Sequence, residues 1–122
     1  MSRTSVRAMI LFVAGGLSLL CGAAHADCAY PKAPASIPDG AKASEGEMSA
    51  AASSFKQYNS DVTAYLACLQ DETAAKSAGV SAAQALQIKS MQSRKHNSAV
   101  DELESNVARF NAQLRAFKSR KA

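Results

Sequence analysis

The sequence predicts an all-α protein: an antiparallel, coiled-coil-like hairpin of two helices, with an extended proline-rich arm that a disulfide pins to it. Three observations predict this fold class. Apolar residues recur every seven positions along two long helix-forming stretches, one turn signal separates the stretches, and two cysteines of the expected mature chain are available to pair.

Residues 1–26 have the pattern of a secretory signal peptide. Two arginines precede an apolar run from Ala8 to Leu20, and the segment closes on Ala24-His25-Ala26, with small residues where a signal peptidase reads. The run is shorter than the roughly 20 residues that cross a bilayer, and no later stretch approaches that length without a charge. We therefore expect cleavage after Ala26, a periplasmic or secreted protein, and no transmembrane segment in the mature chain.

Export decides how the cysteines are interpreted. Cleavage removes Cys21 and leaves Cys28 and Cys68 in one small domain. An exported protein with an even number of cysteines normally has them paired, so we expect a Cys28–Cys68 disulfide. On the chain-entropy model, closing a loop of about 41 residues stabilises the fold by roughly 4 kcal/mol.

Residues 27–43 form the predicted arm. Its three prolines favour an extended path, and Pro38-Asp39-Gly40 is a turn signal. Because the first helix carries Cys68 far from its start, Cys28 reaches it only if the arm doubles back along that helix. Tyr30 and Ile37 would then cover the groove of the helix pair. The arm is thus predicted to be a third, non-helical layer.

The helical hairpin is predicted for residues 44–122, with helices at 45–78 and 82–119. Ser44 with Glu47, and Ser81 with Gln84, have the spacing of capping boxes, while Gly79 stands where a helix commonly ends. Two helices joined by so short a turn pack antiparallel.

A seven-residue repeat marks the seam along which the helices pack. The first helix presents Met48, Ala51, Phe55, Tyr58, Val62, Tyr65 and Leu69 in this register. The second presents Val100, Leu103, Val107, Phe110, Leu114 and Phe117. Such repeats are typical of a coiled-coil-like seam.

The repeat is lost in the polar stretch at residues 92–97. Either the second helix continues with a shifted register, or it breaks near Asn97-Ser98 and Ser98 caps a third helix. No glycine or proline is present there to enforce a stop. We therefore favour a continuous helix, with a three-helix arrangement as the alternative.

The residue types argue against an enzyme or a metalloprotein. The expected mature chain has a single histidine, His96, and its two cysteines are better explained as a disulfide. The carboxylates lack the spacing of a calcium loop, no serine lies in a nucleophile-elbow pattern, and the glycines stand singly rather than in a phosphate-binding loop. We expect no catalytic residue, no metal and no cofactor.

Charge is the remaining indication of function. Residues 27–72 hold three lysines against seven acids, whereas the chain from Thr73 onward holds nine basic residues against three acids. The candidate residues for an anionic partner are Arg94, Lys95, Arg109, Arg115, Lys118, Arg120 and Lys121. The alternative for the C-terminal group is helix-end electrostatics, because cations are favourable at a helix C-terminus. Export and a mature net charge of only +2 argue against nucleic acid.

One resemblance follows from these motifs. The order Cys28-x-x-Pro31, Pro38-Asp39-Gly40, Glu47-Met48 and Tyr65-x-x-Cys68-Leu69, followed by a basic amphipathic end, resembles small uncharacterised exported helical proteins of Gram-negative bacteria. The resemblance implies a periplasmic location and carries no activity.

Two functions remain open at this point. The first is a periplasmic, non-enzymatic binding, adaptor or envelope-maintenance protein that acts on a protein or an anionic envelope partner through its helical faces. The second is a structural protein that self-assembles as a four-helix homodimer without an external ligand, because a two-helix hairpin has a narrow core.

Overall fold

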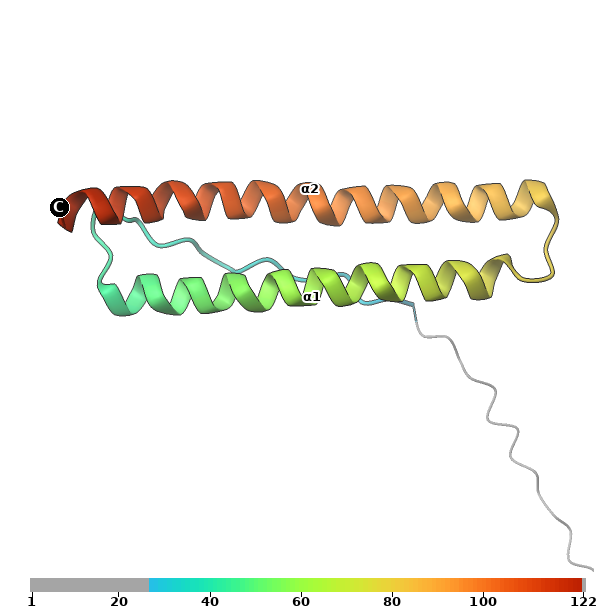
Figure 1. Cartoon of the computed structure of the whole chain (residues 1–122), viewed down its shortest axis with the longest axis horizontal. Coiled ribbons are helices and arrows are strands. Elements are labelled where there is room, and N and C mark those ends of the chain that lie inside the picture. The colour runs from blue at the N-terminus through green and yellow to red at the C-terminus, as the bar shows by residue number, and fades with distance from the viewer. Residues whose placement is uncertain (1–26, 122) are drawn as a thin grey trace, which may run out of the picture.

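The protein is a helical hairpin in the computed structural model, which describes residues 27–121 (Figure 1). Helix α1 spans Glu45–Ser77 and helix α2 spans Ala82–Lys121, and the two lie antiparallel along their whole length. The described residues contain no strand. The expected signal peptide and its cleavage site lie outside the described residues.

Both helices begin at the predicted capping boxes. At the start of α1, the Glu47 amide donates to Ser44 Oγ and the Ser44 amide donates to the Glu47 carboxylate. At the start of α2, Ser81 and Gln84 exchange the same pair of hydrogen bonds. Each pair satisfies two backbone donors that a helix N-terminus leaves unpaired.

The turn between the helices depends on one glycine. Helix α1 ends at Ser77, one residue before the predicted end, and Gly79 has a φ of +73°. Only glycine adopts this left-handed conformation without a steric penalty from a Cβ atom. The chain can therefore reverse within four residues and begin α2 at Ala82.

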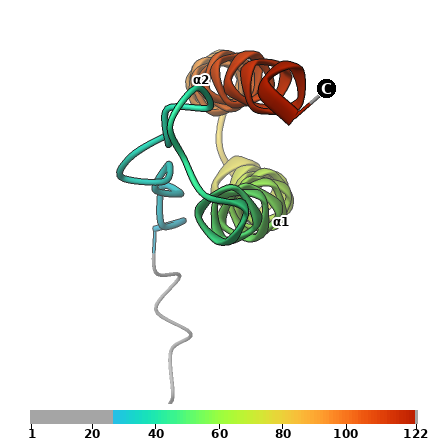
Figure 2. The same cartoon turned by 90° about the vertical axis from the view of Figure 1, so that its left-hand side faces the viewer.

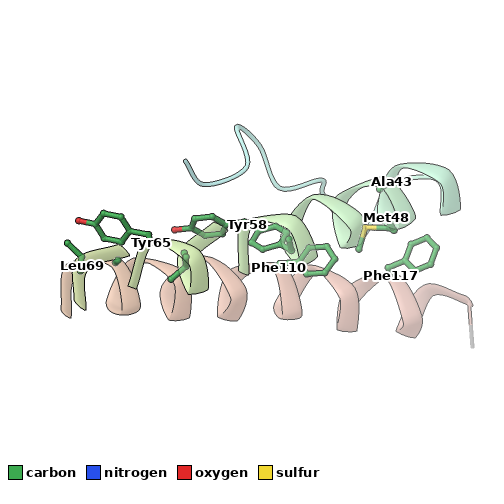
Figure 3. Close-up of a cluster of buried hydrophobic side chains, with 10 residues drawn as sticks. Ala43, Met48, Tyr58, Tyr65, Leu69, Phe110 and Phe117 are labelled. Atoms are coloured by element: carbon green, nitrogen blue, oxygen red, sulfur yellow. The ribbon is translucent and has the colours of Figure 1, made fainter. Parts of the chain in front are cut away.

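The predicted seam of α1 is the core of the protein (Figure 3). Six of its members are buried, namely Met48, Phe55, Tyr58, Val62, Tyr65 and Leu69. From α2, Phe110 stacks on Phe55 with ring centroids 4.7 Å apart, and Phe117 is buried near Met48 at the other end of the row. The aromatic rings therefore fill most of the space between the helices.

One seam assignment on α2 is wrong. The seven-residue repeat placed Val100 in the seam, but the buried residue is Ala99, with 1% of its surface exposed. A straight helix turns once every 3.6 residues, so five turns take 18 residues. Eighteen residues before Phe117, the position on the same face of the helix is therefore residue 99. The register shift that the sequence left open is thus accommodated within a continuous α2, and α2 has no break at Asn97-Ser98.

The arm, residues 27–43, forms the predicted third layer and runs antiparallel to α1 (Figures 1 and 2). Ile37 and Ala33 pack against the buried core, and Tyr30 contacts the Tyr65 ring edge-on at a centroid distance of 5.3 Å. The arm also contacts α2, because the Tyr30 hydroxyl donates to Glu102 at 2.8 Å. The arm therefore covers one side of the aromatic seam.

The disulfide fixes this third layer to α1. Cys28 and Cys68 are bonded, with their Cα atoms 5.8 Å apart, and Cys68 lies on α1 beside Leu69. Ahead of Cys28 the structure describes only Asp27. The described part of the third layer therefore runs along α1 from its start to the region of Cys68 and Lys76, which Asp27 contacts.

Gly40 shows how closely the arm approaches α2. Its amide donates to Gln113 Oε1 at 2.9 Å, and a Cβ atom at this position would overlap the backbone carbonyl of Gln113. By contrast, Gly46 is exposed in the first turn of α1, and the nearest atom to its Cβ position is Ser44 Oγ at 3.9 Å.

We expect Gly40→Ala to destabilise the fold by about 3 kcal/mol, because the arm or α2 must move away. Gly46→Ala is the matched control and should stabilise α1 by up to about 1 kcal/mol, since alanine has the higher helix propensity. Urea unfolding measures both changes. Equal stabilities of the two variants would contradict the close packing of the arm on α2.

Candidate functional site

At the C-terminal end of α2, Arg120 holds the junction between the arm and α1. Its guanidinium donates to the carbonyl oxygens of Ala41 at 3.1 Å and Ala43 at 2.6 Å. The same group lies over the Phe117 ring, 5.0 Å from the centroid. These contacts close the open end of the hairpin, which is a structural role for a residue that the sequence offered as a binding candidate.

Lys121 has a similar role at the same end. Its ammonium lies 2.7 Å from a Glu45 carboxylate oxygen and 5.0 Å from the centroid of Phe117. The hydrogen bond from Lys121 holds the pKa of Glu45 below its usual value. Arg109, Arg115 and Lys118 lie exposed on α2. The predicted basic cluster is therefore divided between residues that contact the arm junction and residues that face solvent.

The other two candidates, Arg94 and Lys95, lie nearer the α1–α2 turn, beside the part of the arm that holds Cys28. Arg94 is exposed and borders a shallow hollow beside Cys28, Tyr30 and Tyr65. Lys95 is half-buried and lines both this hollow and a second, deeper groove. The structure thus separates them from the C-terminal candidates and brings them next to the disulfide.

The seam becomes more polar at the turn end of the hairpin, which we define as residues 69–98. On α1 the repeat that supplies Tyr65 and Leu69 continues with Glu72 and Lys76, both charged. On α2 the facing positions are half-buried residues such as Ala85, Ile88 and Gln92. Apart from Leu69, no residue of the turn end is buried. The helices are therefore held together there by far less apolar contact.

A groove of about 440 Å³ opens between the helices in this region. Its apolar lining comes from Leu69, Val80, Ile88 and Met91, and the rest comes from Glu72, Thr73, Lys76, Lys95 and three glutamines. Leu69 forms the floor with 1% of its surface exposed, whereas Met91 is 53% exposed at the rim. A volume of this size, with mostly apolar walls and a few polar groups, is typical of binding sites. We call it the turn-end groove.

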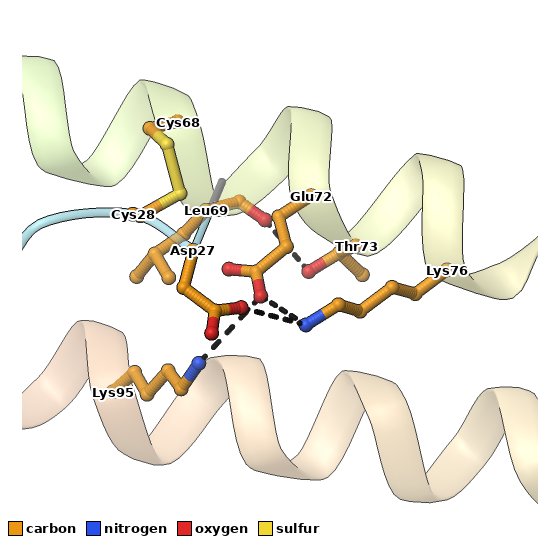
Figure 4. A network of polar contacts seen from close by, with 8 residues as sticks. All are labelled: Asp27, Cys28, Cys68, Leu69, Glu72, Thr73, Lys76 and Lys95. Atoms are coloured by element: carbon orange, nitrogen blue, oxygen red, sulfur yellow. Dashed lines mark hydrogen bonds and ion pairs between the residues drawn. A yellow bond between two sulfur atoms is a disulfide. The ribbon is translucent and has the colours of Figure 1, made fainter. Parts of the chain in front are cut away.

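Four charged side chains meet where the described part of the arm ends and the turn-end groove begins (Figure 4). Glu72, whose side chain is 9% exposed, pairs with Lys76 and lies 3.8 Å from Lys95 Nζ. Lys76 Nζ also lies 3.4 Å from Asp27 Oδ1. The hydrogen bond to Glu72 is the main cause that raises the pKa of Lys76. This network joins both helices and the first described residue of the arm at the mouth of the groove.

The arm's side of the seam has its own polar contact. The pKa of the Tyr30 hydroxyl is raised to about 12. Partial burial is the largest cause, and the hydrogen bond to Glu102 is the second. Burial also raises the pKa values of Tyr58 and Tyr65. These hydroxyls therefore stay protonated across the physiological range. The Tyr30 hydroxyl donates to Glu102, whereas the Tyr58 hydroxyl is buried with no hydrogen-bond partner among the described residues.

Within residues 27–121, no three His, Cys, Asp or Glu side chains are grouped so as to hold a metal ion. No helix in that part of the chain is both long and apolar enough to cross a membrane. The turn-end groove offers apolar walls, amide groups and an ion-pair network. Comparison of the chain with protein-family models, with curated proteins and with solved structures finds no match.

Of the residues that the sequence offered as candidates, Lys95 lines the turn-end groove and Arg94 lines only the neighbouring hollow. The sequence analysis assigned no role to Val80, Ile88 or Met91, which line the groove. The available signal was on α1, where the seam positions after Leu69 are polar. A polar seam beside exposed apolar residues indicates a surface that the chain itself does not cover.

Arg120 and Lys118 provide a direct test of the division within the basic end. We expect Arg120→Gln to lower the free energy of unfolding by roughly 1–2 kcal/mol, because it removes two charge-assisted hydrogen bonds to backbone carbonyls. Lys118→Gln should change it by less than about 0.5 kcal/mol, as for other exposed positions. Urea unfolding compares them, and equal losses would mean that the Ala41 and Ala43 contacts contribute nothing measurable.

Proposed function

We propose that the chain is an exported, non-enzymatic binding or adaptor protein of the periplasm, and that the turn end of its hairpin is the binding surface. One observation carries the proposal. The arm covers the aromatic seam, and no residue of the described arm lines the turn-end groove. A groove with apolar walls in an otherwise narrow helix pair is best explained by a partner that fills it.

The exposed apolar residues support the same surface. Within the described chain, the large hydrophobic side chains that remain exposed are Tyr30, Val80, Leu86 and Met91. Three of the four lie at the turn end, whereas the rest of α1 and α2 exposes polar and small residues. Isolated exposed apolar residues need no explanation, but a group of them beside a groove marks an interaction surface.

Export is the second part of the proposal. The disulfide is compatible with an oxidising compartment, since such bonds are rare in reducing cytosol. The signal-peptide pattern of residues 1–26 and the resemblance to exported proteins of Gram-negative bacteria point to the periplasm. The partner is then a component of the cell envelope.

Self-assembly is the second candidate, and the exposure of Leu86 and Met91 is the observation that favours it. Two copies joined through their turn ends would cover these residues in a four-helix dimer. The same contact would, however, bring together Lys89 and Arg94 of both copies, a cost that a partner of opposite charge avoids. Light scattering distinguishes the two: a one-copy mass supports partner binding, and a tight dimer supports self-assembly.

The Val80→Ser/Met91→Gln double variant tests the binding surface. Both residues are partly exposed, so the free energy of unfolding should change by less than about 1 kcal/mol. Retention in envelope fractions should nevertheless fall severalfold. Ala112→Gln, at an exposed α2 position outside the turn end, is the matched control and should keep full retention.

A further variant separates the turn end from the basic end. This triple variant replaces Arg109, Arg115 and Lys118 by glutamine and leaves the Arg120 contacts intact. If this triple variant loses retention while Val80→Ser/Met91→Gln keeps it, the basic end is the binding surface and the proposal is wrong.

A further inference from the structure

The outermost part of the turn end carries no charge. Residues 77–88, which we call the apolar tip, include the α1–α2 turn and the first two turns of α2. Most of its residues are alanine or similarly small, and Val80 and Leu86 are exposed by 39% and 69%. Leu86 does not line the turn-end groove, so filling that groove would leave it in solvent. The tip therefore needs an explanation of its own.

A group of basic residues, which we call the basic collar, lies next to the apolar tip, on its side toward the middle of the hairpin. From Thr73 to Val100 the chain contains Lys76, Lys89, Arg94 and Lys95 and no acidic residue. Lys76 and Lys95 share Glu72, but Lys89 and Arg94 form no ion pair within residues 27–121. The rise of a helix places Lys89 about 5 Å behind Leu86 along the axis and Arg94 about 12 Å behind it.

The exposed apolar residues at the tip and the basic residues behind them match the order of acyl chains and headgroup phosphates at the surface of an anionic lipid bilayer. Apolar residues of interfacial segments enter the boundary between headgroups and acyl chains to a depth of roughly 5–10 Å. Lysine and arginine at that distance from the inserted residues lie at the level of the headgroup phosphates. We infer that the hairpin docks by its apolar tip on an anionic membrane surface, with Val80 and Leu86 inserted and with Lys89 and Arg94 on lipid phosphates.

The opposite end of the hairpin provides the contrast. It is also basic, but Phe117 is buried there beneath Arg120 and Lys121, and no large apolar side chain among the described residues is exposed at that end. That end has charge alone, whereas the turn end combines charge with exposed apolar residues. A second copy of the chain is disfavoured as the occupant, because the two collars would repel each other.

The inference rests on the proposed function, because it names the anionic lipid surface as the partner of the turn end. A fluorescent reporter tests it, since the chain contains no tryptophan. Leu86→Trp places the reporter in the apolar tip, and Ala112→Trp places it at an exposed position outside the turn end. Both are mixed at low ionic strength with vesicles of phosphatidylglycerol and phosphatidylcholine, or of phosphatidylcholine alone.

We expect the emission of Leu86→Trp to shift to shorter wavelength with the anionic vesicles only, and that of Ala112→Trp to stay unchanged. The affinity of the chain for the same anionic vesicles, measured by sedimentation, should be roughly 25-fold lower in Lys89→Gln/Arg94→Gln than in the wild type, because each cation near an anionic surface contributes about fivefold to binding. It should also fall in Leu86→Gln. The Arg109→Gln/Arg115→Gln/Lys118→Gln variant should bind as the wild type does.

Three results would overturn the inference: no shift of Leu86→Trp with either vesicle, an equal shift of Ala112→Trp, or loss of sedimentation only in the C-terminal triple variant. Absence of vesicle binding together with envelope retention that depends on Val80 and Met91 would leave the proposed function in place. The partner would then be a protein seated in the turn-end groove, and membrane docking would be excluded.

Discussion

The Cys28–Cys68 disulfide sets the position of the arm along the helix pair, and the rest of the structure depends on that position. The bond anchors one end of the arm beside Leu69, and the Arg120 contacts with Ala41 and Ala43 anchor the other end. Between these anchors the arm lies over the aromatic rings. On the chain-entropy model the bond contributes roughly 4 kcal/mol, a large share of the 5–15 kcal/mol typical of a domain.

The same constraint divides the hairpin into two parts with different properties. Where the arm lies, Phe55, Tyr58 and Phe110 are buried and the seam is apolar. Beyond Cys68 the seam contains Glu72 and Gln92, the turn-end groove is open, and Met91 is exposed. Apolar burial therefore concentrates at the end that the arm covers, and the proposed binding surface lies at the other end. A two-helix protein that placed apolar contact evenly along its length would have no such surface.

Much of the fold could be predicted from the sequence because local rules act at identifiable residues. Ser44 with Glu47 and Ser81 with Gln84 fix the helix starts, Gly79 fixes the turn, and the repeat in α1 identifies its core. Other features depend on three-dimensional packing: Ala99 replaces Val100 in the seam because the helix is straight, and Arg120 contacts arm carbonyls that no local pattern specifies. The turn-end groove was not predicted, and of the residues that the sequence offered as binding candidates only Lys95 lines it.

Hydrogen exchange of the oxidised and the reduced protein tests the central claim, that the disulfide holds the arm over the aromatic seam. The Gly40 amide, which donates to Gln113 on α2, is the most informative reporter, and the amides around Ile88 are the comparison. The account predicts that reduction exposes Gly40 to rapid exchange before α1 and α2 lose their protection, and that the turn end changes least. Unchanged protection of Gly40 after reduction, or simultaneous loss of protection along both helices, would contradict it.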